Sequence, residues 1–155
     1  MNAIDILTKD HREVDMLFAE LKKAGSEKGA GTNYKNTFQL LVNALSVHMQ
    51  AEEEIFYPAM RQFEEEEDQV IEAYDEHNEV KGLLKQMSSL EPSSDEFQEN
   101  LDMVITGVQH HVGEEEGEMF PDAQDLLGEA RLEEIGQQIL DLKSENDPRL
   151  SASAL

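Results

Sequence analysis

Residues 48–53 read HMQAEE and residues 111–116 read HVGEEE, so the chain carries two copies of a histidine followed four positions later by a glutamate. On an α-helix, side chains four positions apart stand one turn apart on the same face, and both can reach one ion or two adjacent ions. Imidazole nitrogen combined with carboxylate oxygen suits iron, manganese or zinc. The two stretches therefore predict two helices that carry metal ligands. The ligand pairs are His48 with Glu52 and His111 with Glu115.

The similarity between the two stretches extends along the chain. Residues 10–14 (DHREV) resemble residues 76–80 (EHNEV). In addition, a proline that follows an aromatic residue stands ten positions after His48 and again ten positions after His111. These prolines, Pro58 and Pro121, should kink or end their helices, because proline cannot donate the helical hydrogen bond. A duplicated helix pair would arrange equivalent ligands around a pseudo-two-fold axis, which suits a two-metal centre with two bridging carboxylates.

Apolar residues recur at spacings of three and four along most of the chain, and this period predicts an all-α protein. The expected helices cover residues 2–24, 33–62, 69–89, 94–127 and, as a short fifth helix, 129–143. Ser93 and Glu96 form a capping-box pair for the fourth helix, and Gly128 is a natural terminator. Four long helices joined by short connections pack most simply as an up-down-up-down bundle.

The length of 155 residues suits one domain. We expect the bundle to occupy residues 1–143. Residues 144–155 contain Pro148 and a Ser/Ala ending, so we expect them to form a flexible tail.

A histidine interrupts the apolar stripe of each of the four long helices. These histidines are His11, His48, His77 and His111. Burying a polar group without a partner costs roughly several kcal/mol, so four histidines at similar depth indicate either a buried polar network or, more simply, a shared metal site. With Glu52 and Glu115, the ligands suffice for two ions, each held by two histidines, and one carboxylate of each pattern is free to bridge them.

The composition narrows the classes of function. The chain has no cysteine, which excludes disulfides, thiolate nucleophiles, iron-sulfur clusters and zinc sites built on cysteine. A formal net charge of -23 opposes binding to nucleic acid or anionic lipid, since both depend on clustered lysine and arginine. No signal segment opens the sequence and no apolar run reaches about 20 residues, so we expect a cytoplasmic protein without membrane contact. Whether the chain has a protein partner stays open at this point.

The order His, His-x-x-x-Glu, His, His-x-x-x-Glu resembles the hemerythrin family, specifically the bacterial hemerythrin-like or HHE cation-binding domain. The resemblance covers about residues 4–127. It implies a four-helix bundle around an oxo- or hydroxo-bridged di-iron centre, for which manganese or zinc can substitute. The implied terminal ligands are His11, His48, His77 and His111, and the implied bridges are Glu52 and Glu115.

One position departs from the oxygen-carrying members of that family. They have a fifth histidine one turn before the histidine of the third helix, and here that position is Ala73. A missing protein ligand leaves room for water, an anion, O2 or nitric oxide, which favours reaction or sensing over reversible carriage. Glu76 is a candidate to compensate as an additional ligand. His110 lies about 100° around the helix from His111, so we expect it to face a neighbouring helix or solvent.

Other polar residues lie close to the predicted ligands. We expect Glu53, Glu54, Glu114 and Glu116 on the solvated face, where Glu53 and Glu116 could support hydrogen bonds to the ligands. Tyr57 could be redox-active beside iron, although a core tyrosine with a satisfied hydroxyl is the more common case.

The sequence thus predicts a non-heme di-iron protein that binds or reacts with O2 or related small oxidants, such as peroxide and nitric oxide, in sensing, storage or stress protection. Two alternatives use the same centre as an iron donor that repairs damaged iron-sulfur proteins or as a peroxide-disproportionating enzyme. A third is a bundle in which the metal is purely structural. Whether the chain is an enzyme stays open at this point.

Overall fold

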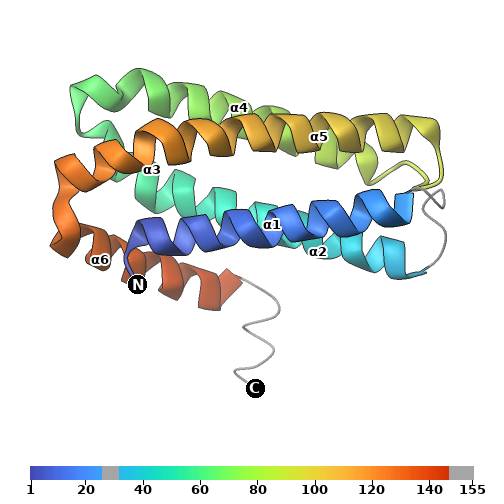
Figure 1. Ribbon diagram of the computed structural model, residues 1–155, viewed down its shortest axis with the longest axis horizontal. Coiled ribbons are helices and arrows are strands. Elements are labelled where there is room, and N and C mark those ends of the chain that lie inside the picture. The colour runs from blue at the N-terminus through green and yellow to red at the C-terminus, as the bar shows by residue number, and fades with distance from the viewer. Residues whose placement is uncertain (26–31, 147–155) are drawn as a thin grey trace.

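The computed structural model describes residues 1–25 and 32–146, and within these ranges every regular element is a helix (Figure 1). The elements are α1 (Ala3–Gly25), α2 (Thr32–Ala51), η1 (Glu52–Phe56), α3 (Tyr57–Arg61), η2 (Glu64–Glu66), α4 (Glu67–Met87), α5 (Asp95–Glu114), η3 (Glu115–Met119) and α6 (Phe120–Asn146). η1 and η3 are π-helical turns, and η2 is a short 3-10 turn. The predicted all-α fold with four long helices and a C-terminal helix is confirmed.

The long helices form two pairs, α1 with α2 and α4 with α5, that run side by side (Figure 1). The second part of α6 folds back along α1. Gly128 has φ 78° and ψ 165°, a left-handed backbone conformation that favours glycine, so the helical run breaks where a terminator was expected. Further on, a Cβ atom at Gly136 would lie 2.6 Å from the carbonyl oxygen of Met1, so only glycine lets α6 approach the N-terminus this closely.

Several predicted boundaries shift. The N-cap of α5 is Ser94, whose extended backbone lets its hydroxyl accept a hydrogen bond from the amide of Phe97, so the expected capping box of Ser93 and Glu96 is wrong. α6 continues to Asn146, past the predicted end at residue 143. The remainder of the predicted tail, residues 147–155, lies outside the described residues.

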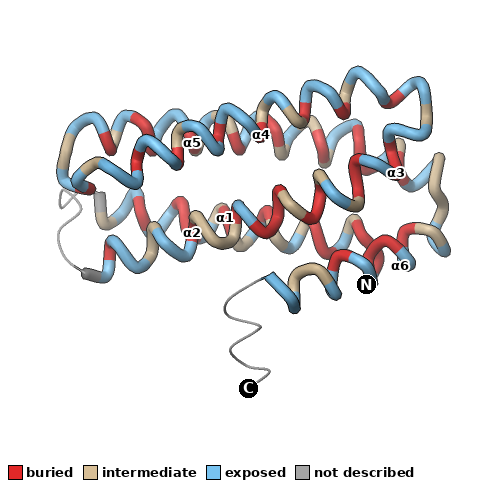
Figure 2. The backbone as a smooth tube through the Cα atoms, turned by 180° about the vertical axis from the view of Figure 1, so that it is seen from behind, coloured by how far each residue is buried: buried red, intermediate tan, exposed pale blue. Residues whose placement is uncertain are grey.

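Buried residues face the interior of the bundle along every helix (Figure 2). They form two apolar clusters, one that includes Leu7 and Phe56 near the start of α1, and one that includes Leu45 and Leu101 further along the bundle. Each fully buried side chain of this size contributes about 1.5–3 kcal/mol through the hydrophobic effect. The two clusters hold the helices together at two levels of the bundle, and a layer of polar side chains lies between these levels.

Among the described residues, no helix is both long enough and apolar enough to cross a lipid bilayer.

Candidate metal centre

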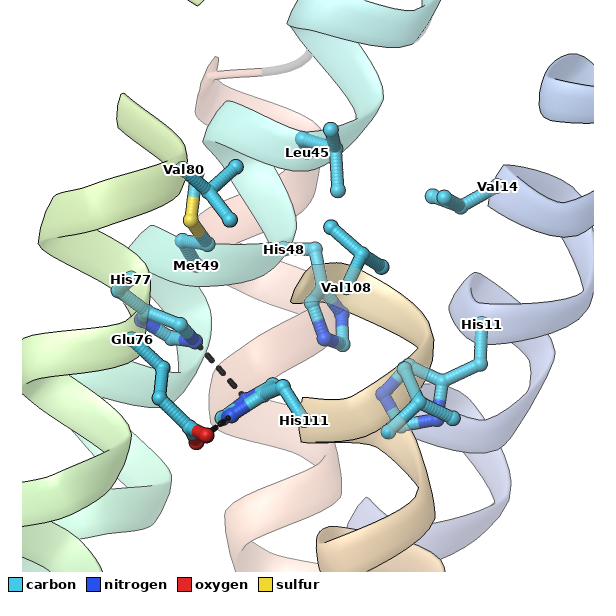
Figure 3. A pocket seen from close by; sticks show the side chains of 11 residues that line it. His11, Val14, Leu45, His48, Met49, Glu76, His77, Val80, Val108 and His111 are labelled. Carbon is cyan, nitrogen blue, oxygen red and sulfur yellow. Dashed lines mark hydrogen bonds and ion pairs between the residues drawn. The ribbon is translucent and has the colours of Figure 1, made fainter. Parts of the chain in front are cut away.

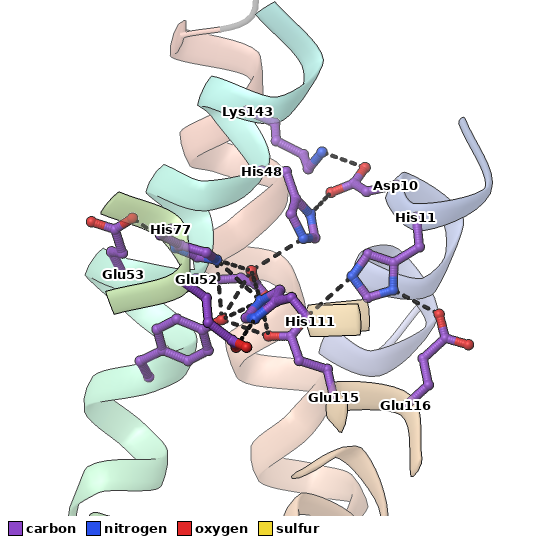
Figure 4. A network of polar contacts seen from close by, with 12 residues as sticks. Asp10, His11, His48, Glu52, Glu53, His77, His111, Glu115, Glu116 and Lys143 are labelled. Atoms are coloured by element: carbon purple, nitrogen blue, oxygen red, sulfur yellow. Dashed lines mark hydrogen bonds and ion pairs between the residues drawn. The ribbon is translucent and has the colours of Figure 1, made fainter. Parts of the chain in front are cut away.

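The layer between the two apolar clusters is polar and contains all six predicted ligands. Their exposed fractions are His11 3%, His48 5%, Glu52 0%, His77 3%, His111 7% and Glu115 1%. Each comes from a different element, because α1, α2, α4 and α5 supply the histidines, while η1 and η3 supply the glutamates. The periodicity of the sequence therefore located a real cluster, in which the side chains point toward one another (Figure 4).

The six side chains form two overlapping groups that could each hold one ion. One group consists of His11, His48, Glu52 and Glu115, and the other of Glu52, His77 and His111, with the potential ligand atoms of each group within 4.8 Å of one another. Glu52 joins the groups, since its Oε1 lies 3.1 Å from the Nε2 atoms of both His48 and His77. Glu115 also joins the two groups, because its Oε1 lies 3.2 Å from His11 Nε2 and its Oε2 lies 3.3 Å from His111 Nε2. The glutamates thus lie where bridging carboxylates would be needed.

Several buried atoms of the cluster form no well-oriented hydrogen bond, although some of them lie within ion-pair distance of one another. They are His11 Nε2, His48 Nε2, Glu52 Oε2 and Glu115 Oε1. A buried polar atom without a partner costs about 1–3 kcal/mol, and native structures rarely tolerate several together. Imidazole nitrogens and carboxylate oxygens that converge at one depth are the donors that iron, manganese and zinc prefer. The residues present therefore fit a metal site.

In the metal-free protein, protons take the place of cations. Burial lowers the pKa of His48, but the charge of Glu52 and the hydrogen bond to Asp10 outweigh burial and raise this pKa to about 10. The pKa of His111 is also raised, since Glu115 and Glu76 outweigh its burial. Burial raises the pKa of Glu52, but His48 beside it holds that pKa well below its usual value. These neighbouring charges thus favour the protonated form of both imidazoles, and metal binding must displace those protons.

In each of these four histidines, the ring nitrogen that points away from the cluster, Nδ1, donates a hydrogen bond to a carboxylate (Figure 3 and Figure 4). The Nδ1 bonds run from His11 to Glu116 at 2.7 Å, from His48 to Asp10 at 2.9 Å, from His77 to Glu53 at 2.8 Å and from His111 to Glu76 at 2.8 Å. Such bonds fix the orientation of the ring and raise the basicity of the nitrogen that faces the metal. In the internal repeat, Asp10 corresponds to Glu76 and Glu53 corresponds to Glu116.

This arrangement changes the interpretation of the flanking acids. Glu76, considered as an additional ligand, instead accepts the Nδ1 hydrogen bond of His111. Glu53 and Glu116 support the ligands as expected. Asp10 was missed, although it precedes His11 in the repeat as Glu76 precedes His77.

Permanent cations face three of these four carboxylates. Arg12 pairs with Glu116, Lys143 with Asp10 at 2.6 Å, and Lys81 with Glu53 at 2.8 Å. Within residues 1–25 and 32–146, no lysine or arginine is paired with Glu76, whose other charged neighbour besides His111 is His110, with Nε2 at 3.6 Å. The His110 side chain is 64% exposed and lies closer to Glu114, at 2.9 Å, so it faces solvent as expected and stays outside the cluster of ligands.

The π-helical turns explain how the glutamates are placed. η1 begins at Glu52 and η3 at Glu115, and each ends two positions before a proline. Helical backbone continues through Pro58 and Pro121, so neither proline ends its helix. The expectation that the prolines end the helices is wrong, and each helix instead has a local π turn just before its proline. In these turns the amide of Tyr57 bonds to the carbonyl of Glu52, and the amide of Phe120 bonds to the carbonyl of Glu115. Single π turns of this kind are frequent at functional sites.

Tyr57 is the member of the cluster that sequence reasoning undervalued. It is fully buried, and its hydroxyl lies 2.5 Å from Glu115 Oε2, 3.1 Å from His111 Nε2 and 3.2 Å from both His77 Nε2 and Glu52 Oε1. Burial and the neighbouring carboxylates Glu115 and Glu52 raise the pKa of this phenol well above its usual value in the metal-free protein. The signal that could have found it is the internal repeat, since Tyr57 stands five positions after Glu52 as Phe120 stands five positions after Glu115.

A small cavity adjoins the histidines on the side of the second apolar cluster (Figure 3). Its volume is about 20 Å³, roughly the space of one water-sized molecule. The apolar side chains that line it are Val14, Leu45, Met49, Val80, Val108 and Val112. The four histidines form its opposite wall together with Glu76.

Comparisons with known proteins agree with this architecture. The family model described as Hemerythrin HHE cation binding domain matches residues 2–123. A protein of Nostoc sp. (strain PCC 7120 / SAG 25.82 / UTEX 2576) named DNA nickase is 32% identical over 154 residues, covering 99% of this chain and 42% of the relative. An uncharacterized hemerythrin-like protein of Schizosaccharomyces pombe (strain 972 / ATCC 24843) is 29% identical over 127 residues, covering 81% of this chain and 61% of the relative. The chain thus spans less than two thirds of either relative.

Among solved structures, a hemerythrin HHE cation binding domain-containing protein from Mycobacterium kansasii superposes with a TM-score of 0.82. The match covers 95% of this chain and 88% of the other, at 22% identity. At this identity the match establishes the shared fold.

Proposed function

The chain belongs to the hemerythrin HHE cation-binding domain family, and from that premise we propose that it holds a di-iron centre that binds or reacts with O2 or a related small oxidant. One ion would take His11 and His48, the other would take His77 and His111, and both would share the carboxylates of the two repeated patterns. The bridging residues would be Glu52 and Glu115. The roles in view are sensing, storage and protection against oxidants such as peroxide or nitric oxide.

The observation that carries the proposal is the set of buried, unpartnered donor atoms at one depth of the bundle. An apolar core of the same volume would avoid their desolvation cost, so the cluster costs stability unless a cation satisfies it. Two groups that share Glu52 supply donors for two ions rather than one.

When bound, iron supplies the open coordination positions and the electron transfer that small oxidants require. The protein's own side chains orient the ligand groups and limit the access of solvent to them. The Nδ1 bonds to Asp10, Glu53, Glu76 and Glu116 keep every imidazole in the orientation that presents Nε2 to the centre. The apolar wall of the cavity admits a molecule of a few atoms and offers no hydrogen bonds to water, which favours an uncharged diatomic ligand over bulk solvent.

A nucleic-acid substrate does not follow from the Nostoc relative named DNA nickase. The chain covers 42% of that protein, so the remaining length can carry the named activity. The net charge of -23 also opposes the approach of a phosphate backbone. The cytoplasmic location and the lack of nucleic-acid and membrane partners stay predictions from the sequence.

The test is metal analysis after anaerobic reconstitution, followed by an optical titration of the reduced protein with O2, peroxide and nitric oxide. We expect about two iron ions per chain and a visible absorption change with at least one of these ligands. Fewer than about one iron per chain, or no optical response to any of them, would refute the proposal.

The titration also separates the alternatives that share this centre. Repeated consumption of peroxide by catalytic amounts of protein would identify a peroxide-disproportionating enzyme. Loss of iron to an apo iron-sulfur protein would identify iron donation. A redox-silent metal that only raises the unfolding temperature would identify a structural site.

A further inference from the structure

We propose that the phenol oxygen of Tyr57 is a further protein ligand of the ion held by His77 and His111. This inference rests on the proposed function, because it concerns the same centre. It assigns the two ions unequal numbers of protein donors.

The contacts of the Tyr57 hydroxyl exceed what a phenol can satisfy with hydrogen bonds. The oxygen has four neighbours within 3.2 Å, namely His77 Nε2, His111 Nε2, Glu52 Oε1 and Glu115 Oε2. A phenol offers one donor and about two acceptor sites, so at most about three contacts can be hydrogen bonds at one time. All four neighbours are donor atoms that the proposed centre assigns to this ion.

The spacing of these atoms matches that of ligands around one ion. With metal–ligand distances of about 2.0–2.2 Å, two adjacent ligand atoms at a right angle lie roughly 2.8–3.1 Å apart. The distances from the hydroxyl oxygen to the two histidine nitrogens are 3.1 and 3.2 Å. The phenol oxygen therefore occupies the same shell as the imidazoles instead of an outer layer.

Local backbone structure delivers the side chain to this place. In a regular α-helix Phe56 would follow Glu52 by one turn, but the π turn inserts one residue and the amide of Tyr57 bonds to the carbonyl of Glu52. The phenol is thereby set directly beside the bridging carboxylate. Ala73, where a fifth histidine would stand, is buried in the same apolar cluster and leaves the position for the phenol to fill.

The duplicated half of the chain provides an internal comparison. Phe120 is the counterpart of Tyr57, since its amide bonds to the carbonyl of Glu115 after the second π turn. Its ring stacks on the ring of His11 at a centroid distance of 5.8 Å with an interplanar angle of 4°. A phenylalanine brings no oxygen, so the ion of His11 and His48 keeps only its two histidines and the shared carboxylates, and is the one with room for a small ligand.

Ferric loading of the whole chain tests the assignment by spectroscopy, independently of activity. A phenolate bound to iron(III) gives a visible charge-transfer band, and Raman excitation within that band enhances ring vibrations that shift when the tyrosines carry ring deuterium. We expect both signals in the wild-type protein and their loss in Tyr57→Phe. The matched control is Tyr74→Phe, since Tyr74 lies 5.4 Å from Tyr57 between ring centroids but donates its hydroxyl to the carbonyl of Glu53.

The outcomes separate this inference from the proposed function. A wild-type protein that takes up two iron ions without a deuterium-sensitive phenolate signal refutes the ligand role of Tyr57 and leaves the metal centre intact. A wild-type protein that takes up no iron refutes the proposed function itself. If Tyr57→Phe fails to fold, Tyr57→His supplies an alternative donor, and it should retain two ions while losing the phenolate signal. A signal that persists in Tyr57→His, or that disappears in Tyr74→Phe, would overturn the assignment.

Discussion

Replacing Glu53 by glutamine should weaken metal binding while leaving the fold almost unchanged. Glu53 accepts the Nδ1 hydrogen bond of His77 at 2.8 Å and pairs with Lys81, whose side chain is 45% exposed. Glutamine keeps the volume and an accepting oxygen, but it removes the negative charge that makes the imidazole a stronger donor to the metal.

The two partners of Glu53 set the expected magnitudes. An exposed ion pair such as the one with Lys81 is worth about 0–1 kcal/mol, so the metal-free protein should lose no more than about that in its free energy of unfolding. Loss of a carboxylate behind a metal-binding histidine typically costs about 10–100-fold in metal affinity, or roughly 1.4–2.7 kcal/mol. The effect on metal binding should therefore exceed the effect on folding.

The assay is competition for zinc with a chromophoric chelator, combined with denaturant unfolding of the metal-free proteins. The matched control is Glu54→Gln, which changes the net charge by the same amount at an exposed position in the same turn. We expect Glu53→Gln to raise the zinc dissociation constant at one position at least about tenfold relative to Glu54→Gln. Equal constants for the two variants would show that the outer carboxylate does not tune its histidine, and the reasoning would fail.

Three further predictions concern other parts of the chain. Burial and the neighbouring carboxyl of Asp122 raise the pKa of Glu66 from 4.5 to about 7, so the folded state binds this proton more tightly than the unfolded state. Denaturant unfolding should show the wild type losing on the order of 1 kcal/mol relative to Glu66→Gln as the pH rises from 4.5 to 7. Gly136→Ala should lower the unfolding temperature, because its Cβ meets backbone of the N-terminus, whereas Gly82→Ala, with nothing within 4 Å, should raise it. His110→Ala should leave the metal content unchanged in elemental analysis, since that side chain is 64% exposed.

Helical periodicity was sufficient to find the six clustered residues. His48 and Glu52 share a face because four residues make about one helical turn, and burial of the apolar stripe carries them into the core. The same rule identified His110 as an outward-facing residue. These inferences depend only on local geometry, which the chain retains as far as each bridging glutamate.

Periodicity failed where the local geometry or the tertiary packing changed. The π turn after Glu52 adds a residue per turn, so Tyr57 reaches the centre from a position that a period of 3.6 assigns elsewhere. The partnership of Asp10 with His48 joins α1 to α2, and that of Glu76 with His111 joins α4 to α5. Such pairs depend on how two helices pack against each other. The spacing of residues along a single helix does not specify that packing.

The duplication supplies equivalent ligands, so the differences between the halves determine how the two proposed ion positions differ. At the position of His11 and His48, both outer carboxylates face permanent cations, Arg12 and Lys143. At the position of His77 and His111, only the carboxylate behind His77 has a lysine, and the counterpart of the phenylalanine is a tyrosine. The second position is therefore surrounded by fewer permanent cations, and with the proposed Tyr57 ligand it would also have more oxygen donors, which favours a more highly charged ion. The first position would have fewer donors, and it adjoins the same cavity. With two ions bound as proposed, a symmetric frame with unequal outer charges would hold one ion tightly and leave the other open to a small ligand.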